Sequence, residues 1–336
     1  MTEQQPQSGT RWTVMVTGAK LAEEAESLLT TKGCATIYVD GYAGTEALRE
    51  AARTHRVDAI LVRQGKIDRS VIEASDRLKV IAKHGSGVDN IDLTAADDRS
   101  IPVLRALSAN AQSVAELTLS LTLSLLKDVT VLDRAVKGGN WPKTSYVGRD
   151  IAGTSFGVIG YGDIGRRAAS LARALGMSAL AFDPGAVAAD EGVERVETLD
   201  ALLERADVIS LHCPLTERTR NLIGAKELAL MGPGSFLVNT ARGGLIDEMA
   251  LHHALANGHI AGAALDSFAQ EPPAPDHHLF GLDNLIATPH VGGASRSALR
   301  NMAVQSATNI LTFLEHGTFE VAAQAKPSLA SMPVNA

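Results

Sequence analysis

The sequence contains little cysteine, few aromatic residues and no excess of positive charge. Its two cysteines, Cys34 and Cys213, are far apart and do not have the spacing of metal ligands. A disulfide framework and a thiolate metal site are therefore excluded, and we expect no metal cofactor. Such sparing use of cysteine is typical of a reducing compartment, so we expect a cytoplasmic protein.

Long apolar runs are also missing. The longest, residues 114–126, is too short and too rich in serine and threonine to span a bilayer. The first ten residues are polar and lack the apolar segment of a secretory signal, so we expect no leader. With 31 basic against 38 acidic side chains, the net charge is −7, and we expect neither nucleic acid nor a membrane surface as a partner.

The sequence does contain a long alternation of short apolar runs and helix-like segments, which predicts parallel sheets with helices on both faces. The fold class is therefore α/β, with two doubly wound domains and boundaries near residues 107 and 294. A final amphipathic helix is expected at 296–317. The predicted strands are 11–18, 35–40, 57–63, 78–85 and 101–106 in the first part, then 154–160, 178–183, 206–213, 235–240, 260–268 and 284–290.

Residues 113–138 interrupt this alternation. Between Leu117 and Leu125, apolar residues alternate with serine and threonine, which is the period of a strand. The segment has no glycine or proline before Gly138, however, and is longer than an ordinary strand. We therefore predict a helix that ends at the Gly138–Gly139 pair.

Gly160, Gly162 and Gly165 form a G-x-G-x-x-G motif between a predicted strand and a predicted helix. The first glycine allows a tight turn, the second lets the backbone approach a pyrophosphate, and the third lets helix and strand pack closely. Asp183 ends the next strand, where an acid accepts hydrogen bonds from ribose hydroxyls and repels the 2′-phosphate of NADP. The motif therefore predicts NAD binding, although Asp163 is unfavourable near a pyrophosphate unless it points away.

Three ionisable residues follow this motif in glycine- or proline-marked loops after predicted strands: Arg242, Glu271 and His290. The carboxyl ends of the strands are where open α/β sheets bind ligands. An arginine fork binds a carboxylate, and a histidine exchanges a hydroxyl proton as hydride moves. A carboxylate beside the histidine favours the imidazolium form and orients the ring. Taken alone, each residue is better explained by a structural role, but together they predict hydride transfer at a 2-hydroxy or 2-keto acid.

Residues 13–317 resemble the D-isomer-specific 2-hydroxyacid dehydrogenases, and within that family the phosphoglycerate dehydrogenase and hydroxypyruvate reductase types. The resemblance implies that Arg242 binds the substrate carboxylate, that His290 is the acid/base and that Glu271 pairs with His290. Asp266 would hold the nicotinamide carboxamide, and Cys213 would be a packing residue. The matching motifs are GSGVDNIDL, SVAELTLSL, GVIGYGDIGRR, FDP, NTARGGLIDE, ALDSF, EPP and TPHVGG.

The resemblance also implies which other residues contact ligands. The cofactor would contact Ser86, Gly160, Gly162, Asp163, Ile164, Gly165, Asp183, Cys213, Thr240, Ala241, Arg242, Asp266, His290 and Gly292. The substrate would contact Arg63, Lys83, Gly85, Ser86, Gly87, Arg242 and His290. Gly85 and Gly87 would allow backbone N–H groups to approach the carboxylate. Arg63 and Lys83 would bind a second anionic group on the substrate, unless they are solvated surface charges.

The architecture implied is a flavodoxin-like substrate domain, 11–107 with 295–320, into which an NAD-binding Rossmann domain, 108–294, is inserted. Residues 1–10 and 321–336 are expected to be flexible tails, with no appended regulatory domain. The family resemblance further implies a homodimer formed through the NAD-binding domain, with residues 136–150 and Trp141 at the interface. Substrate would bind between the domains, and their closure would exclude water.

Several alternatives stay open. The substrate is a small 2-keto or 2-hydroxy acid, either 3-phosphoglycerate with 3-phosphohydroxypyruvate or hydroxypyruvate with glyoxylate. A non-catalytic NAD(H)-sensing protein, such as a corepressor of the same fold, can retain Arg242, Glu271 and His290. Oxidation of formate or phosphite is less favoured, because no residues specific to those substrates are seen.

Overall fold

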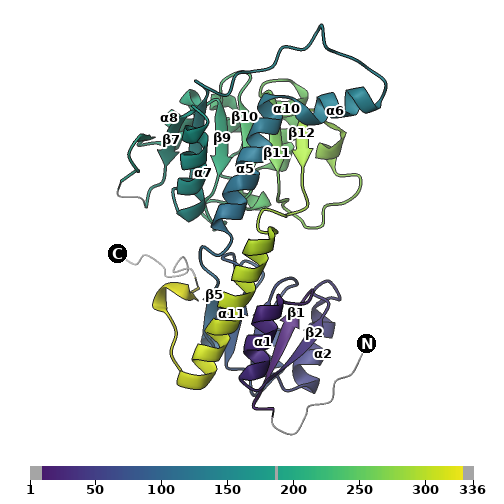
Figure 1. The fold of residues 1–336 in the computed structure, drawn as a ribbon, viewed down its shortest axis with the longest axis vertical. Helices are drawn as coiled ribbons and strands as arrows, with labels where there is room; N and C mark the ends of the chain where they lie inside the picture. The colour runs from purple at the N-terminus through teal and green to yellow at the C-terminus, as the bar shows by residue number, and fades with distance from the viewer. Residues whose placement is uncertain (1–9, 186–187, 328–336) are drawn as a thin grey trace, which may run out of the picture. The chain divides into compact units, whose positions relative to one another are not determined.

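The structure, a computed structural model, describes residues 10–185 and 188–327. These form two compact units (Figure 1). One contains the described residues up to Asn110 and from Arg296 onwards, and the other contains Ala111–Ser295. The expected boundaries near 107 and 294 lie close to these. The tails expected at residues 1–9 and 328–336 lie outside the described residues.

The first unit is a six-stranded sheet in the order β13–β5–β4–β3–β1–β2. All neighbouring strands are parallel except β13, which is antiparallel to β5. The order 2-1-3-4-5 within it is flavodoxin-like, as predicted. The strands are β1 (Trp12–Thr17), β2 (Cys34–Val39), β3 (Ala59–Val62), β4 (Val80–Lys83), β5 (Val103–Arg105) and β13 (Gln324–Ala325).

Helices cover both faces of this sheet. Figure 1 shows α1 (Glu23–Thr31) beside the long C-terminal helix α11 (Arg296–His316). Both contribute to one apolar layer, in which Ile310 and Leu29 pack with Val14 and Leu61 of the strands. The opposite layer holds the buried faces of α2 (Thr45–Thr54), α3 (Arg69–Glu73) and α4 (Leu93–Asp98). The final helix thus belongs to the first unit, as the family resemblance implied.

Residues 321–325 differ from the flexible tail that we expected. They form a 3-10 turn, η3 (Val321–Ala323), followed by β13 on the edge of β5. Nη2 of Arg105 donates to the carbonyl oxygen of Ala322 at 3.0 Å, and Ala323 is buried. Residues 321–325 show no regular alternation of apolar and polar side chains. Such a pattern is not needed here, because the segment pairs with the exposed edge of β5 through its backbone.

The second unit is a seven-stranded parallel sheet in the order β12–β11–β10–β9–β6–β7–β8. The six predicted strands are confirmed as β6 (Ser155–Ile159), β7 (Ser178–Phe182), β9 (Val208–Leu211), β10 (Phe236–Asn239), β11 (Gly262–Leu265) and β12 (Leu285–Ala287). The seventh, β8 (Val193–Arg195), was not predicted, because its three edge residues include no buried one. The strand order is that of a dinucleotide-binding sheet.

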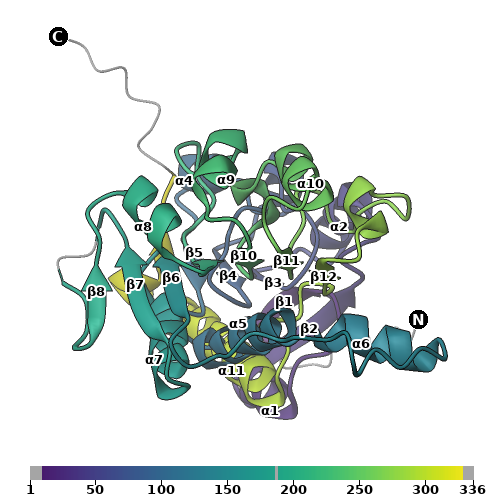
Figure 2. The ribbon, with the colours of Figure 1, turned by 90° about the horizontal axis from the view of Figure 1, so that it is seen from above.

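Figure 2 shows the helices of this unit on the two faces of its sheet. On one face, α5 (Ala111–Leu126) and α7 (Asp163–Ala174) contribute to an apolar layer around Phe156 and Val238. On the other lie α8 (Leu199–Arg205), α9 (Ala225–Leu230) and α10 (Glu248–Ala256). Two 3-10 turns, η1 (Gly243–Leu245) and η2 (His278–Gly281), lie in its loops.

The predicted helix over 113–138 is confirmed as helical but is broken in two. After α5, Asp128 adopts φ +49°, and a second helix, α6 (Val129–Lys137), begins. Hydroxyl groups in α5 donate to carbonyl oxygens four residues earlier, as Thr118 does to Val114 and Thr122 to Thr118. This bonding satisfies the polar side chains within the helix and explains why the strand-like alternation is misleading.

Among residues 10–185 and 188–327, no helix is both long enough and apolar enough to cross a membrane. The same residues contain no group of histidine, cysteine and acidic side chains arranged to hold a metal ion.

Candidate active site

The turn between β6 and α7 has the geometry that a dinucleotide pyrophosphate requires. Gly160 adopts φ +96°, and a Cβ there would lie 2.6 Å from the amide nitrogen of Cys213. A Cβ on Gly165 would lie 2.2 Å from the carbonyl oxygen of Gly160, so glycine is needed for α7 to approach the strand. A Cβ on Gly162 would meet nothing within 4 Å. The backbone at Gly162 is thus open to a ligand at the N-terminus of α7.

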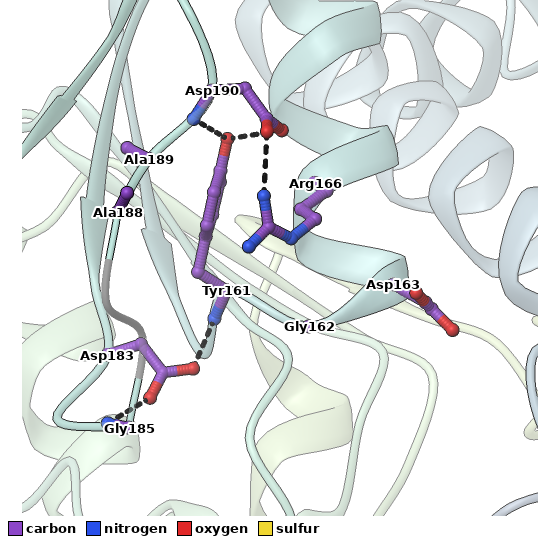
Figure 3. A pocket seen from close by; sticks show the side chains of 9 residues that line it. All are labelled: Tyr161, Gly162, Asp163, Arg166, Asp183, Gly185, Ala188, Ala189 and Asp190. Atoms are coloured by element: carbon purple, nitrogen blue, oxygen red, sulfur yellow. Dashed lines mark hydrogen bonds and ion pairs between the residues drawn. The ribbon is translucent and has the colours of Figure 1, made fainter.

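Asp183 follows β7 and lines a cavity of about 670 Å³ beside this turn (Figure 3). The N–H of Tyr161 donates to its Oδ2 at 2.8 Å, and the N–H of Gly185 donates to its Oδ1 at 2.7 Å. These bonds fix the carboxylate at the cavity wall, where its other lone pairs suit ribose hydroxyls. The cavity is also lined by Tyr161, Gly162, Asp163, Arg166, Gly185, Ala188, Ala189 and Asp190.

A second carboxylate in this cavity is neutralised within the protein. Asp190 accepts hydrogen bonds from Nη1 of Arg166 at 2.7 Å and from the hydroxyl of Tyr161 at 2.9 Å. Asp163 is exposed and lies on the far side of Gly162 from Asp183 (Figure 3). The residues around the turn therefore fit a dinucleotide.

Arg242 lies in the loop after β10. The buried side chain of Asn239 holds this loop through two hydrogen bonds to its backbone. Nδ2 of Asn239 donates to the carbonyl oxygen of Arg242 at 2.8 Å, and Oδ1 accepts from the N–H of Ala241 at 3.0 Å. Nη1 of Arg242 in turn donates to the carbonyl oxygen of Ala241 at 2.7 Å. A Cβ on Gly243 would lie 1.9 Å from the carbonyl carbon of Phe268. Glycine therefore lets this loop contact the segment that carries Glu271.

Glu271 and His290 form a hydrogen-bonded pair. Oε2 of Glu271 lies 2.7 Å from Nδ1 of His290, and Oε1 accepts from the N–H of Phe268 at 3.0 Å. Partial burial opposes ionisation of Glu271, but the bond and charge of His290, the N–H of Phe268 and the charge of Arg242 outweigh it. The pKa of Glu271 is therefore lowered. A carboxylate only accepts hydrogen bonds, so Nδ1 of His290 carries the proton and Nε2 is directed elsewhere.

The turn that carries His290 is held by Asp266, which is buried at the end of β11. His290 adopts φ +54°, which is unusual for a residue other than glycine. Oδ1 of Asp266 accepts from the N–H of Val291 at 2.9 Å, and Oδ2 accepts from that of Gly292 at 2.8 Å. The hydroxyl of Thr288 also donates to Oδ1 at 2.6 Å. Asp266 thus orders both sides of His290.

The remaining cofactor candidates of this unit lie around the same strand ends. Burial raises the pKa of the Cys213 thiol to about 11, which suits a packing residue rather than a nucleophile. The hydroxyl of the buried Thr240 lies 2.8 Å from that of Thr118 in α5. Ile164 is partly buried in the first turn of α7, and Gly292 accepts a hydrogen bond from the hydroxyl of Ser113 at 2.6 Å.

The other candidate substrate residues belong to the first unit and lie at the ends of β3 and β4. Arg63 donates from Nη1 to the carbonyl oxygens of Ala19 and Lys20, and Nζ of Lys83 donates to Oδ1 of Asn90 at 3.0 Å. Gly85 adopts φ +134°, and Ser86 is exposed between Gly85 and Gly87. These residues share one edge of the first sheet, where the carboxyl ends of parallel strands bind ligands.

Sequence reasoning missed the residues that support this site. Asn239 holds the Arg242 loop, Glu248 holds the Glu271 turn, and Tyr161 with Arg166 neutralises Asp190. Asn239 lies inside a motif that was recognised, NTARGGLIDE, so a buried polar residue at a strand end was the available signal. Glu248 lies in the same motif, and Tyr161 and Arg166 lie in GVIGYGDIGRR, but their contacts depend on how loops distant in the sequence fold.

The fold and these residues define a dinucleotide-binding α/β protein with an arginine, a glutamate and a histidine at the strand ends. A family model described as D-isomer specific 2-hydroxyacid dehydrogenase, NAD binding domain, matches residues 119–292. The chain therefore belongs to the D-isomer-specific 2-hydroxyacid dehydrogenase family, a family of NAD-dependent oxidoreductases. The family inferred from the sequence and NAD as its cofactor are thus confirmed.

Named relatives and a solved structure agree with this assignment. The chain is 45% identical over 245 residues to D-3-phosphoglycerate dehydrogenase of Methanocaldococcus jannaschii, covering 72% of this chain and 47% of that protein. It is 41% identical over 252 residues to hydroxypyruvate reductase of Thermotoga maritima, covering 74% and 82%. A glyoxylate reductase structure from Paecilomyes thermophila matches with a TM-score of 0.84 and 30% identity, covering 94% and 98%. The chain thus spans about half the length of the phosphoglycerate dehydrogenases it matches.

Proposed function

We propose that this protein is an NAD-dependent D-2-hydroxyacid dehydrogenase that interconverts a small 2-keto acid and its 2-hydroxy acid. The observation that carries the proposal is the pair formed by Glu271 and His290, 2.7 Å apart at strand ends and within the field of Arg242. Bound NADH would supply the hydride from C4 of its nicotinamide to C2 of the keto acid. The glycine turn and Asp183 would hold its pyrophosphate and adenosine ribose.

The protein's own groups supply the remaining chemistry. Arg242 would bind the substrate carboxylate through its planar guanidinium and polarise the adjacent carbonyl. Because Nδ1 of His290 donates to Glu271, the opposite nitrogen, Nε2, is the one that would give a proton to the carbonyl oxygen during reduction. Glu271 would stabilise the imidazolium before that transfer and keep the ring oriented afterwards. In the oxidative direction His290 would take the proton back.

Within this class, we propose hydroxypyruvate, glyoxylate or 3-phosphohydroxypyruvate as the keto acid. Relatives named phosphoglycerate dehydrogenase and hydroxypyruvate reductase support this range. Gly85, Ser86 and Gly87 would contribute backbone N–H groups to the substrate, and Arg63 and Lys83 would bind a phosphate. If they do, Arg63→Ala raises KM for the phosphorylated acid more than for glyoxylate. An equal change in KM for both acids would show that Arg63 does not bind the phosphate.

We also propose a homodimer formed through the NAD-binding unit, in a reducing, cytoplasmic compartment. None of the residues of α6 is buried, and several large apolar side chains on α6 and after it are exposed: Val129, Val131, Val136, Trp141 and Val147. Burial of such a patch in a subunit interface would remove this apolar area from water. The cysteines Cys34 and Cys213 form no disulfide. Light scattering of the wild type and of Trp141→Ala tests the dimer.

The proposed activity is tested by following NADH oxidation with each of the three keto acids. We expect turnover with at least one of them. Where hydroxypyruvate or 3-phosphohydroxypyruvate is reduced, chiral analysis should show the D-hydroxy acid, whereas the glycolate formed from glyoxylate is achiral. NADH binding without reduction of any 2-keto acid would contradict the proposal and favour the non-catalytic NAD(H)-sensing protein.

A further inference from the structure

Glu248 and His277 form a largely buried pair next to the turn that carries Glu271. Glu248 begins α10, His277 precedes η2, and their side chains are only 12% and 14% exposed. Nε2 of His277 lies 3.2 Å from Oε2 of Glu248. Polar groups this deeply buried are retained only when hydrogen bonds satisfy them, so their partners show what the pair holds.

The hydrogen bonds define the tautomer of His277. The N–H of Leu279 points at Nδ1 of His277 at 3.4 Å, so Nδ1 is an acceptor. The proton of the neutral ring then lies on Nε2, which donates to Glu248. His277 also stacks on His278, with ring centroids 4.4 Å apart, and Nε2 of His278 lies 3.2 Å from the carbonyl oxygen of Glu248. The Glu248 carboxylate is therefore held in one orientation.

The other carboxylate oxygen of Glu248, Oε1, holds the turn formed by residues 268–271. Oε1 accepts from the N–H of Ala269 at 2.8 Å, and the neighbouring N–H of Phe268 donates to Glu271 at 3.0 Å. Two consecutive N–H groups are thus bound by two different glutamates. The ring of Phe268 makes edge contacts with His277 and Phe280, at centroid distances of 5.7 and 5.6 Å. The backbone between Phe268 and Glu271 is fixed by Glu248 and by these rings.

We propose that Glu248 and His277 are positioning residues that hold the 268–271 turn so that Glu271 faces Nδ1 of His290. The inference rests on the proposed function, because it assigns the pair to the same proton-transferring histidine. Neither residue contacts His290 directly in the interactions described, so they act through Glu271. Removal of the pair would leave Glu271 in the protein but let it lose its alignment with the imidazole.

The first test needs no catalysis. In protein labelled with ¹⁵N-histidine, the Nδ1–H proton of His290 gives a hydrogen-bonded resonance, identified by its loss in His290→Gln. We expect Glu248→Ala to abolish or broaden this resonance and Glu248→Gln to retain it, because glutamine still accepts from Ala269. Glu204→Ala, an exposed glutamate of α8, is the matched control and should leave it unchanged. An unchanged resonance in Glu248→Ala would overturn the proposal.

Glu248 also lies in the first turn of α10, where its charge stabilises the helix, so Glu248→Ala could fail to fold. His277→Phe then provides the same test, since it keeps an aromatic ring beside Phe268 and removes the donor to Glu248, together with the acceptor for the N–H of Leu279. We expect it to broaden the His290 resonance with an unchanged urea midpoint. A sharp, unshifted resonance would again overturn the proposal.

The second test is a double-mutant cycle on kcat. A residue that orients a functional side chain contributes about 10-fold or more, so Glu248→Ala should lower kcat about 10-fold with the Kd for NADH unchanged. In a Glu271→Gln background the same substitution should change kcat less than about twofold, because the group it orients is already gone. Equal losses in both backgrounds would contradict the proposal. If the wild type reduces no 2-keto acid, the proposed function fails while the resonance still decides the positioning role.

Discussion

Oε2 of Glu271 lies 2.7 Å from Nδ1 of His290, and this contact determines which imidazole nitrogen faces the substrate in the proposed reaction. A glutamine at 271 keeps the shape but lacks the charge that stabilises the imidazolium. We expect Glu271→Gln to lower kcat about 10- to 100-fold, the usual effect of losing such a partner. The Kd for NADH, measured by fluorescence, should stay within about twofold of the wild type. A parallel loss of NADH affinity would show that Glu271 organises the cofactor site instead.

Asp183 is predicted to set the choice between NAD and NADP. Its carboxylate accepts from two backbone N–H groups at the cavity wall, which places a fixed negative charge where a 2′-phosphate would enter. If the repulsion between this carboxylate and the 2′-phosphate amounts to about 1.4 kcal/mol, its removal changes the ratio of the two rates tenfold. Asp183→Ala should therefore reduce the NAD/NADP ratio of kcat/KM about 10-fold. Asp200→Ala, an exposed aspartate of α8, is the control, and an unchanged ratio in Asp183→Ala would remove the proposed role.

Much of this arrangement could be predicted from the sequence, since strands and glycine turns have local signals. The apolar runs located β1–β5 and six strands of the second sheet, and the glycine spacing located the turn at Gly160. Other features depend on tertiary contacts. The break at Asp128 follows from where burial ends after Leu126, and β13 exists because β5 has an open edge.

The same division applies to the site. Arg242, Glu271 and His290 stand beside glycines and prolines that mark strand ends, so their roles could be proposed together. Their supports could not, because Asp266 and Glu248 act through bonds to backbone N–H groups of distant loops. Every residue type except proline presents a backbone N–H, so such contacts leave no pattern in the sequence.

Asp58 and Arg77 form a pair that stabilises the first unit. Asp58 is fully buried and accepts from Nε and Nη2 of Arg77 at 3.1 and 2.9 Å. Among the residues that the structure describes, Arg77→Ala would leave the buried carboxylate with the N–H of Thr13 as its one donor, so we expect a loss of about 3 kcal/mol in the free energy of unfolding. Urea denaturation measures this loss. Arg53→Ala, in an exposed pair on α2, is the control and should lose much less stability. Equal effects of both variants would contradict this account.

The lowered pKa values of two histidines, His84 and His212, determine how we expect stability to depend on pH. Burial lowers the pKa of His84 to about 4, aided by the charge of Arg63, and burial lowers that of His212 to about 4. His212 keeps some exposed surface, but its Nδ1 is buried and has no hydrogen-bond partner among the described residues. An unfolded histidine has a pKa of about 6.5. Above that pH both states are neutral and stability is complete.

As the pH falls from about 6.5 to about 4, the unfolded chain takes up protons that the folded protein does not, so stability is lost. Each histidine contributes at most about 3 kcal/mol to this loss. The melting temperature, measured in steps of pH, should fall less steeply in His84→Gln and in His212→Gln than in the wild type. Identical slopes in all three proteins would show that neither histidine is responsible.

The central claim is that His290 transfers the proton that accompanies hydride transfer, and it is tested most directly by His290→Gln. The measurement is kcat for reduction of hydroxypyruvate, or of whichever keto acid the wild type reduces, together with the Kd for NADH. General acid–base catalysis contributes about 10²- to 10⁴-fold, so kcat should fall by that factor while the Kd stays within about twofold. A kcat close to that of the wild type, or equal losses of turnover and NADH affinity, would contradict the claim.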